Sequence, residues 1–497
     1  MGKKYVFSII VFLLVIPVLG ADSYTDVTVS EAKTMIDSNP SLVILDVRTQ
    51  SEYDEGHIRN AKLIPHTELV GRLNELNEAD AILVYCRTGV RSSIASQILV
   101  DNGFSNVYNM LEGITAWISE GYPIYVKYSS IQEALNNANE GNTIFVSSGV
   151  YYEDIVVNKS VSLVGENKYN TIIDGNGTQI IEIRENDTTL AGFTVRNGST
   201  GILLYYSSNS NISNNIIANI SMYGISFSDS NNNTVSDNLL LNISQYGLLL
   251  SNSRNNLICR NQINQTAGIL DESGGNTYIE NTIFAHRITY EGPTYEIPMN
   301  IWSSNNIIQG NVILNGSRVI ISGSKNNVSY NVIMNNEMDG IFIDGESNTI
   351  IGNNLTSNEN GISLFYSNDN TIVDNNIVNC KQHGMWIYSS FNNIIYNNNL
   401  VNNGKQVDVQ GSVNSWDDGL GAGNYWSDYE EKYPYATEID ESGIWNTPYV
   451  VDANNIDRYP LVIQFIIPEF PSLLILPLFM IATLLAVIAY RRKCSPK

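Results

Sequence analysis

The sequence predicts a multidomain protein: an α/β domain with a parallel sheet and helices on both faces, then an all-β right-handed parallel β-helix, then a C-terminal transmembrane helix. Three observations support this prediction. Residues 23–127 alternate between short apolar segments and amphipathic helical segments. Residues 128–412 repeat an asparagine-rich unit about every 22 residues. Residues 473–490 form an apolar run followed by a basic tail.

The composition limits the classes of partner. The chain has 497 residues, with 50 acidic and 27 basic side chains and a net charge of -23. Nucleic acid requires a basic surface, so it is excluded as a partner. The acidity fits a soluble extracellular surface. The four cysteines, Cys86, Cys259, Cys380 and Cys494, do not form the pattern of a disulfide scaffold.

The N-terminal segment 1–21 is typical of a secretory signal peptide. Lys3 and Lys4 precede the apolar run 5–19, and Gly20 and Ala21 offer small residues for cleavage. An uncleaved membrane anchor is the alternative.

The first domain, residues 23–127, has the strand and helix order of a parallel α/β sheet. The predicted strands are 42–47, 81–85 and 106–110, and the predicted helices are 29–38, 68–77 and 92–102.

Cys86 follows the second of these strands and begins the loop Cys86-Arg87-Thr88-Gly89-Val90-Arg91. A helix follows the loop, so the loop amides are expected to point at the sulfur, lower the pKa of the thiol and bind anions. The two arginines of the loop favour an anionic ligand.

Further motifs occur in a fixed order around this loop: Asp46-Val47-Arg48, Glu52-Tyr53, Gly56-His57-Ile58, and then Gly113, Trp117 and Gly121-Tyr122-Pro123. This domain resembles the rhodanese family from end to end. The resemblance implies that Cys86 takes a sulfane sulfur from a small anionic donor such as thiosulfate, forms a persulfide and passes the sulfur to a nucleophile. It implies substrate binding by Arg87, Thr88, Gly89, Val90 and Arg91, with Asp46, Arg48 and Glu52 bracing the loop. His57 is expected to cap or pack.

Two alternatives remain for this domain. Dual-specificity phosphatases of similar architecture have a loop one residue longer between the cysteine and the arginine, so the six-residue loop here favours sulfur over phosphate. The second alternative is an inactive interaction domain, against which the retained Cys86 argues.

The repeats of residues 128–412 are too short to close a core singly and must stack. Units beginning at Thr349 and Thr371 lie 22 residues apart. We predict two ladders of hydrogen-bonded asparagines along the stack. The first consists of Asn215, Asn238, Asn261, Asn281, Asn311, Asn331, Asn353, Asn375 and Asn397. The second consists of Asn233, Asn256, Asn276, Asn306, Asn326, Asn348, Asn370 and Asn392.

The repeats resemble NosD-type and pectin-lyase-like β-helices, with a capping helix near 130–135, a first strand near 143–146 and a projecting insertion at 286–304. The residues of these repeats fit neither the copper chemistry of NosD relatives nor polysaccharide cleavage well. Only His286 and His383 lie in the repeats. Asp339 with Asp344 is the nearest acidic pair, and turn carboxylates are the simpler interpretation.

Residues 413–464 are predicted to close the stack. Related archaeal caps carry an acidic, glycine-spaced loop that suggests calcium binding. This sequence retains three residues of such a loop, Glu438, Asp440 and Gly443. No other cofactor or metal is expected. Beyond the cap, 468–497 combine Pro468-Glu469-Phe470, the apolar run and a basic tail. This order resembles archaeal PEF-type sorting signals; a plain single-pass anchor is the alternative.

The combined prediction is an exported, membrane-anchored cell-surface protein with a sulfurtransferase domain on a β-helix stalk. The alternative is a surface protein whose β-helix binds glycan or another cell-envelope ligand, with an accessory rhodanese domain.

Overall fold

The computed structural model describes residues 23–289 and 292–467, and the chain divides into two compact units between Lys127 and Tyr128. The expected signal peptide, PEF motif and transmembrane helix lie outside the described residues. Within the described part of the chain, no helix is both long and apolar enough to cross a membrane.

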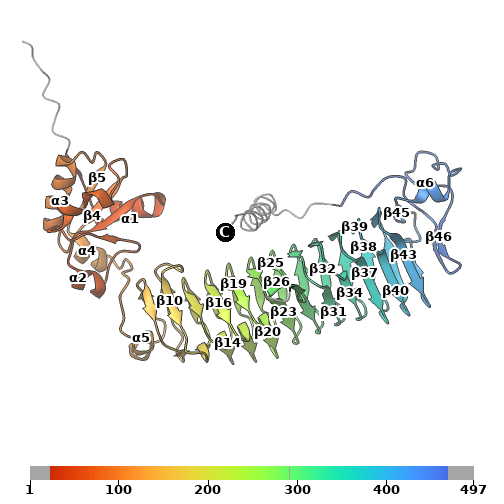
Figure 1. Cartoon of the computed structure of the whole chain (residues 1–497), viewed down its shortest axis with the longest axis horizontal. Helices are drawn as coiled ribbons and strands as arrows, with labels where there is room; N and C mark the ends of the chain where they lie inside the picture. The colour runs from red at the N-terminus through yellow and green to blue at the C-terminus, as the bar shows by residue number, and fades with distance from the viewer. Residues whose placement is uncertain (1–22, 290–291, 468–497) are drawn as a thin grey trace, which may run out of the picture. The chain divides into compact units, whose positions relative to one another are not determined.

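The first unit contains one five-stranded sheet in the order β1-β5-β4-β2-β3. Figure 1 labels its strands β4 and β5. All its strand pairs are parallel. The strands are β1 (Thr25–Val27), β2 (Val43–Asp46), β3 (Lys62–Leu63), β4 (Ile82–Tyr85) and β5 (Val107–Met110). The three predicted strands are confirmed as β2, β4 and β5, and the short edge strands β1 and β3 are additional.

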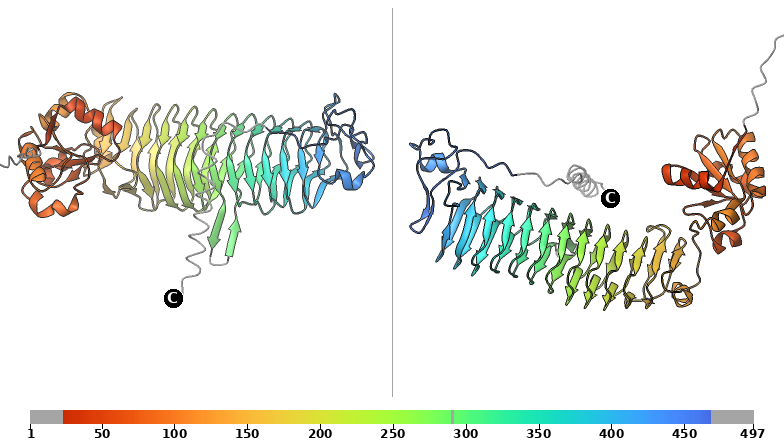
Figure 2. Two further views of the ribbon diagram at one scale, coloured as in Figure 1. Left: turned by 90° about the horizontal axis from the view of Figure 1, so that it is seen from above. Right: turned by 180° about the vertical axis from the view of Figure 1, so that it is seen from behind.

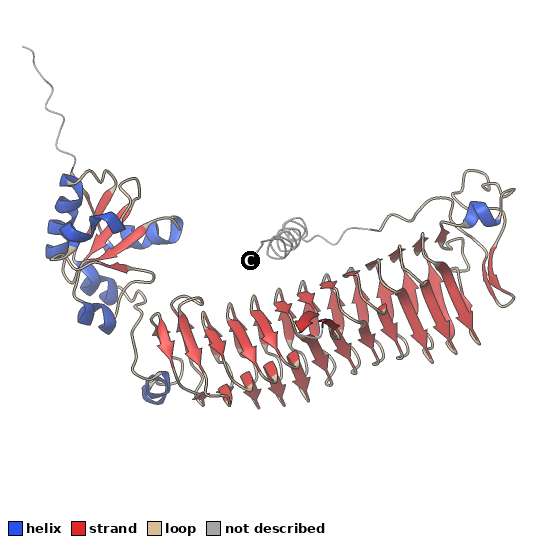
Figure 3. Ribbon diagram, in the orientation of Figure 1, coloured by secondary structure: helices blue, strands red, loops and turns tan. Residues whose placement is uncertain are grey.

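Helices cover both faces of this sheet, as predicted (Figure 3). They are α1 (Val29–Ser38), α2 (Gln50–Glu55), the 3₁₀ helix η1 (Leu69–Glu75), α3 (Val90–Asp101) and α4 (Gly113–Ser119). Ala32 of α1 and Trp117 of α4 belong to one core, whereas Ala95 of α3 and Leu69 of η1 belong to the other.

Two of these helices differ from the prediction. The segment expected as helix 68–77 is the 3₁₀ helix, and it is kinked at Arg72, which has φ −124° and ψ 15°. Helix α3 begins at Val90 rather than Ser92, so the last two residues of the predicted loop belong to its first turn.

The second unit is a parallel β-solenoid with three long sheets of 13, 12 and 13 strands (Figures 1 and 2). The 13-stranded sheets run from β6 (Thr143–Val146) to β44 (Val413–Ser415) and from β7 (Gly149–Tyr151) to β45 (Tyr425–Trp426). The 12-stranded sheet, named here the β8–β43 sheet, runs from β8 (Ile155–Val157) to β43 (Lys405–Gln410). Its right-handed sense remains a prediction.

Buried asparagines form the predicted ladders. Asn353, for example, accepts hydrogen bonds from the backbone N–H of Asn331 at 3.0 Å and from its side-chain amide at 2.9 Å. Asn353 in turn donates to Asn375 at 3.0 Å and to the carbonyl oxygen of Val328 at 2.8 Å. Each amide thus satisfies backbone groups that the turns leave unpaired.

The prediction was wrong by one residue at the last member of each ladder. Asn375 donates to Asn398 rather than Asn397, and Asn370 donates to Asn393 rather than Asn392. The cause is one extra residue in this coil, because Thr371 pairs with Ile394, which lies 23 residues later. Asn392 and Asn397 instead adopt left-handed backbone conformations, with φ 59° and 55°.

The insertion that interrupts the period is an antiparallel hairpin, which projects from the side of the stack in Figure 2. Its strands are β26 (His286–Thr289) and β27 (Gly292–Tyr295).

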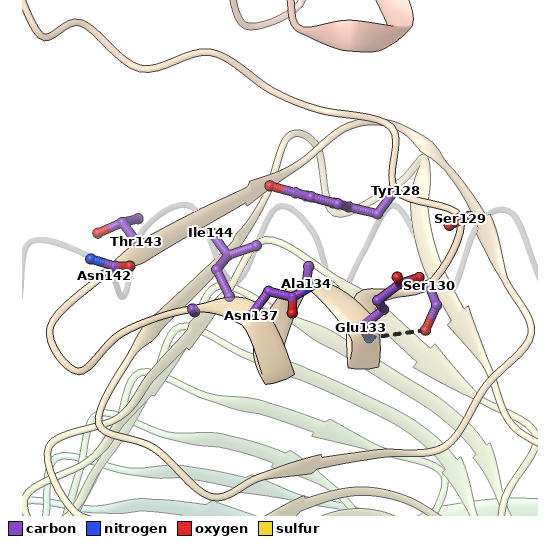
Figure 4. Close-up of a pocket in the computed structure, with 10 residues that line it drawn as sticks. Tyr128, Ser129, Ser130, Glu133, Ala134, Asn137, Asn142, Thr143 and Ile144 are labelled. Carbon is purple, nitrogen blue, oxygen red and sulfur yellow. Dashed lines mark hydrogen bonds between the residues drawn. The ribbon is translucent and has the colours of Figure 1, made fainter.

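Helix α5 (Ile131–Asn137) covers the first coil, with Ser130 as its N-cap. A pocket of about 550 Å³ lies between this helix and Tyr128 (Figure 4). None of the predicted site residues line it. The far end of the stack is closed by α6 (Tyr429–Lys432) and by the hairpin of β46 (Tyr449–Asp452) and β47 (Asn455–Asp457).

Candidate active site

Cys86 lies at the carboxyl end of the central strand β4, directly before the loop that leads into α3. Parallel sheets of this type present their ligand sites at the carboxyl ends of strands. The cysteine is buried, with an exposed fraction of 1%. The backbone N–H of Gly89 donates to its Sγ at 3.2 Å.

The loop carbonyls are turned away from the sulfur by the first turn of α4. The N–H of Ile114 donates to the carbonyl oxygen of Cys86 at 2.9 Å, and the N–H of Thr115 donates to that of Arg87 at 3.1 Å. Because each carbonyl points oppositely to the amide of the same peptide plane, the following loop amides are directed to the sulfur side. The loop therefore forms a concave set of N–H groups, as in an anion-binding nest.

Two glycines permit this close approach. A Cβ on Gly113, which has φ +59°, would lie 2.4 Å from the carbonyl oxygen of Cys86. Gly89 caps α3 at φ 91°, a conformation that side chains disfavour.

The site favours the thiolate. Burial opposes ionisation of Cys86, but hydrogen bonds from the Ser92 side chain and from the amides of Ser92, Thr88 and Gly89 outweigh it, so the pKa of Cys86 is lowered. Burial instead raises the pKa of Cys259, and raises that of Cys380 to about 12. Among the three cysteines in the described residues, only Cys86 has the environment of a nucleophile.

The two loop arginines differ in environment. Arg87 is exposed on the rim of the loop. The guanidinium of Arg91 instead forms a bidentate pair with the carboxylate of Glu52, at 2.6 and 2.8 Å. This pairing lowers the pKa of Glu52 to about 2, although burial acts to raise it.

Asp46 and Arg48 form a separate, buried pair below the loop. Arg48 Nη2 donates to Asp46 Oδ2 and to the carbonyl oxygen of Gly56, both at 2.7 Å. The guanidinium carbon of Arg48 lies 5.5 Å from the ring centroid of Tyr85, the residue before Cys86. The pair thereby joins the end of β2 to the C-terminus of α2 and to the base of the loop.

His57 packs, as expected. It is buried and stacks on Tyr53 with ring centroids 3.7 Å apart, and its Nδ1 lies 2.9 Å from the carbonyl oxygen of Tyr53.

The sequence did not single out Ser92, although it belongs to the loop motif. Its side chain is fully buried and lies within hydrogen-bonding reach of Cys86. A serine one residue after the last loop arginine, at the first turn of the helix, was the available signal.

Among the described residues outside this domain, acidic side chains form no comparable site. Asp339 is 2% exposed and is paired with Arg318 at 3.0 Å, whereas Asp344 is exposed. In the cap, Glu438 accepts a hydrogen bond from the N–H of Gly443 at 2.6 Å. Within residues 23–289 and 292–467, no group of three or more His, Cys, Asp or Glu side chains could hold a metal ion. Calcium in the cap stays a prediction.

Comparison with known proteins supports both units. The family described as "Rhodanese-like domain" matches residues 28–120. The family described as "Periplasmic copper-binding protein (NosD)" matches residues 135–295 and 298–431. The YrkF protein of Bacillus subtilis is 39% identical over 97 residues, which cover 20% of this chain and 52% of YrkF. Thiosulfate sulfurtransferase 18 of Arabidopsis thaliana is 36% identical over 118 residues, covering 21% of this chain and 85% of the plant protein.

Among solved structures, a rhodanese-related protein of Thermoplasma volcanium matches 21% of this chain and 100% of its own, with 31% identity and a TM-score of 0.20. The chain spans about half the length of YrkF, and the matches to YrkF and to the plant protein each cover about a fifth of this chain. Because the NosD match extends over more than half of the chain, the protein belongs to the NosD family, and it carries a rhodanese-like domain N-terminal to its β-solenoid.

Proposed function

We propose that the rhodanese-like domain is a sulfurtransferase in which Cys86 carries the transferred sulfur as a persulfide. The observation that carries the proposal is the set of loop N–H groups around a thiol of lowered pKa. The relative named thiosulfate sulfurtransferase 18 supports thiosulfate as a donor.

The chemistry balances without any additional oxidant. The Cys86 thiolate attacks the sulfane sulfur of thiosulfate, the S–S bond of the donor breaks, and sulfite leaves with the electron pair. A nucleophile such as cyanide or a thiolate then attacks the outer sulfur of the persulfide. The Cys86 thiolate departs and is ready for another cycle.

The loop residues have distinct proposed roles. Thr88, Gly89 and Val90 supply backbone amides to the persulfide and to the donor. Arg87 binds the anionic end of the donor from the exposed rim. Arg91 contributes its positive charge to the thiolate while Glu52 holds it in place. Asp46 and Arg48 keep the base of the loop rigid.

The test is formation of thiocyanate from thiosulfate and cyanide by the full chain. Cys86→Ser is expected to abolish it, whereas Cys380→Ser, which changes another buried thiol, is expected to leave it unchanged. Turnover that survives Cys86→Ser, or no turnover with thiosulfate or another sulfane donor, would exclude the proposed chemistry.

Copper binding, which the family name mentions, is not part of the proposal. The chain has four histidines, and its described residues contain no cluster of His, Cys, Asp and Glu that fits a metal. His383 contacts Asn360, with Nδ1 2.9 Å from its Oδ1.

We also propose export, with the β-solenoid outside the cell and the chain held by its C-terminal apolar run. The supports are the signal-like residues 1–21, the run 473–490 with its basic tail, and the periplasmic location in the family name. Protease treatment of intact cells tests this: the β-solenoid should be degraded while a cytoplasmic marker survives. Full protection of the β-solenoid would contradict export.

A further inference from the structure

The outer face of the β8–β43 sheet carries a cluster of aromatic rings near its C-terminal end. In β40, Met385 and Ile387 point into the core and are fully buried. Because side chains alternate along a strand, Trp386 and Tyr388 face outward. The same alternation places Phe365 outward in the neighbouring strand. The strands concerned are β34 (Asp339–Ile343), β37 (Asn360–Phe365), β40 (His383–Tyr388) and β43.

These rings contact one another across successive coils. Phe365 lies 5.5 Å from Phe342, 4.7 Å from Trp386 and 5.4 Å from Tyr388, measured between ring centroids. Tyr366, which is 66% exposed, extends the cluster beyond Tyr388 at 5.5 Å. We name these five residues the aromatic face.

The β-solenoid itself does not require aromatic residues at these positions. Phe342 and Trp386 belong to one row of side chains that runs along the sheet. At this row the other coils from β14 to β37 carry small, aliphatic or amide side chains: Leu203, Ser226, Leu249, Leu270, Asn300, Ile320 and Ser363. The aromatic face is therefore a local feature added to a regular stack.

Hydrogen-bonding groups surround the rings, and their charges are paired. The carboxylate of Asp339 binds Arg318 at 3.0 Å and Ser363 at 2.6 Å. The guanidinium carbon of Arg318 lies 5.0 Å from the centroid of Phe342.

On the other side, Asp408 pairs with Lys405 and accepts from Gln410 at 2.8 Å. His383 stacks beside Trp386 at 6.1 Å. The indole N–H of Trp386 is buried and has no acceptor among the described residues.

We propose that the aromatic face binds a neutral glycan chain. A pyranose ring has C–H groups on its faces and hydroxyls around its edge, which matches a run of partly exposed aromatic rings bordered by hydrogen-bonding groups. A run of rings along the stack suits a polymer better than a single sugar. The rim offers charged groups that are already paired, and the net charge of -23 repels acidic polymers, so a neutral chain is favoured over an anionic one.

The experiment is electrophoresis of the full chain through native gels that contain a soluble polysaccharide. Galactomannan, hydroxyethylcellulose and laminarin serve as neutral probes, and alginate as an anionic one. We expect retardation by a neutral polymer and none by alginate. Trp386→Ala and Phe365→Ala should each weaken the binding about tenfold.

Tyr205→Ala is the matched control. Tyr205 lies on the same sheet in β14 (Thr200–Tyr205), and its ring contacts Tyr206 at 4.6 Å, but Ser228 occupies its position in the next coil. This variant should bind as the native chain does. Trp386→Phe keeps a ring and should retain part of the affinity, and thermal unfolding of every variant verifies that the coil remains folded.

Three results would overturn the proposal: no retardation by any of the neutral polymers, retardation by alginate alone, or equal weakening by Tyr205→Ala. Cys86→Ser should bind glycan normally, so the result is independent of the sulfurtransferase.

Discussion

Arg91 in the first turn of α3 and Glu52 in α2 form a bidentate ion pair, 39 residues apart in the sequence. Glu52 is also the N3 residue of the capping box that begins α2, where it accepts from the N–H of Thr49 at 3.1 Å. One carboxylate therefore fixes a helix start and the last residue of the Cys86 loop. We therefore expect the order of the loop to depend on this carboxylate.

We expect Glu52→Gln to loosen the loop by about 1 kcal/mol, after allowance for solvent screening of a partly exposed pair. The pKa of Glu52 is lowered to about 2 in the folded protein, so its contribution is present at neutral pH and is lost as the pH falls from the ordinary carboxyl range towards 2. Hydrogen exchange of the loop amides measures this. Identical acid sensitivity in native and variant chains would show that the pair does not hold the loop.

Arg87→Ala and Arg91→Ala should differ in kinetics. Arg87 is exposed and is not held by an ion pair among the described residues. Its removal is therefore expected to raise the KM for thiosulfate about tenfold with little change in kcat. Removal of Arg91 releases Glu52 and should mainly lower kcat. Steady-state kinetics of both variants decides, and a KM effect confined to Arg91→Ala would reverse the two roles.

Alkylation by iodoacetamide should separate the cysteines by pH. The lowered pKa of Cys86 predicts that its reaction rate rises at lower pH than that of an ordinary thiol, whereas Cys380, with a pKa of about 12, should stay unreactive in the folded chain. Peptide mass spectrometry after timed alkylation reads each site separately. A Cys86 rate that rises only in the ordinary thiol range would contradict an activated thiolate.

Asn353→Ala should destabilise its coil by about 1–3 kcal/mol, because the backbone N–H of Asn331 loses its buried acceptor. The adjacent, exposed Asn354 offers the control Asn354→Ala, for which little change is expected. Hydrogen exchange is the suitable readout, since long repeat arrays do not unfold in two states. Equal protection in both variants would mean that the ladder adds no stability.

The sequence was most informative where residues recur or occur in a fixed order. The asparagine ladders were predictable because each coil must satisfy the same turn groups, and one extra residue between Asn376 and His383 displaced their last members. The strand before Cys86 was also predictable, since a buried parallel strand is almost wholly apolar.

Other features depend on contacts that no local pattern encodes. The Arg91–Glu52 pair joins segments that become neighbours only when α2 and α3 pack on the sheet. The aromatic face was missed because its rings lie about one coil apart in the sequence, and only the register between strands brings Phe365 beside Tyr388.

The central claim is that Cys86 carries sulfur, and intact-protein mass spectrometry after thiosulfate treatment without an acceptor tests it most directly. We predict a mass increase of one sulfur atom that maps to Cys86, disappears on addition of cyanide and is absent from Cys86→Ser. A chain that gains no sulfur under these conditions, or gains it equally in Cys86→Ser, would contradict the claim.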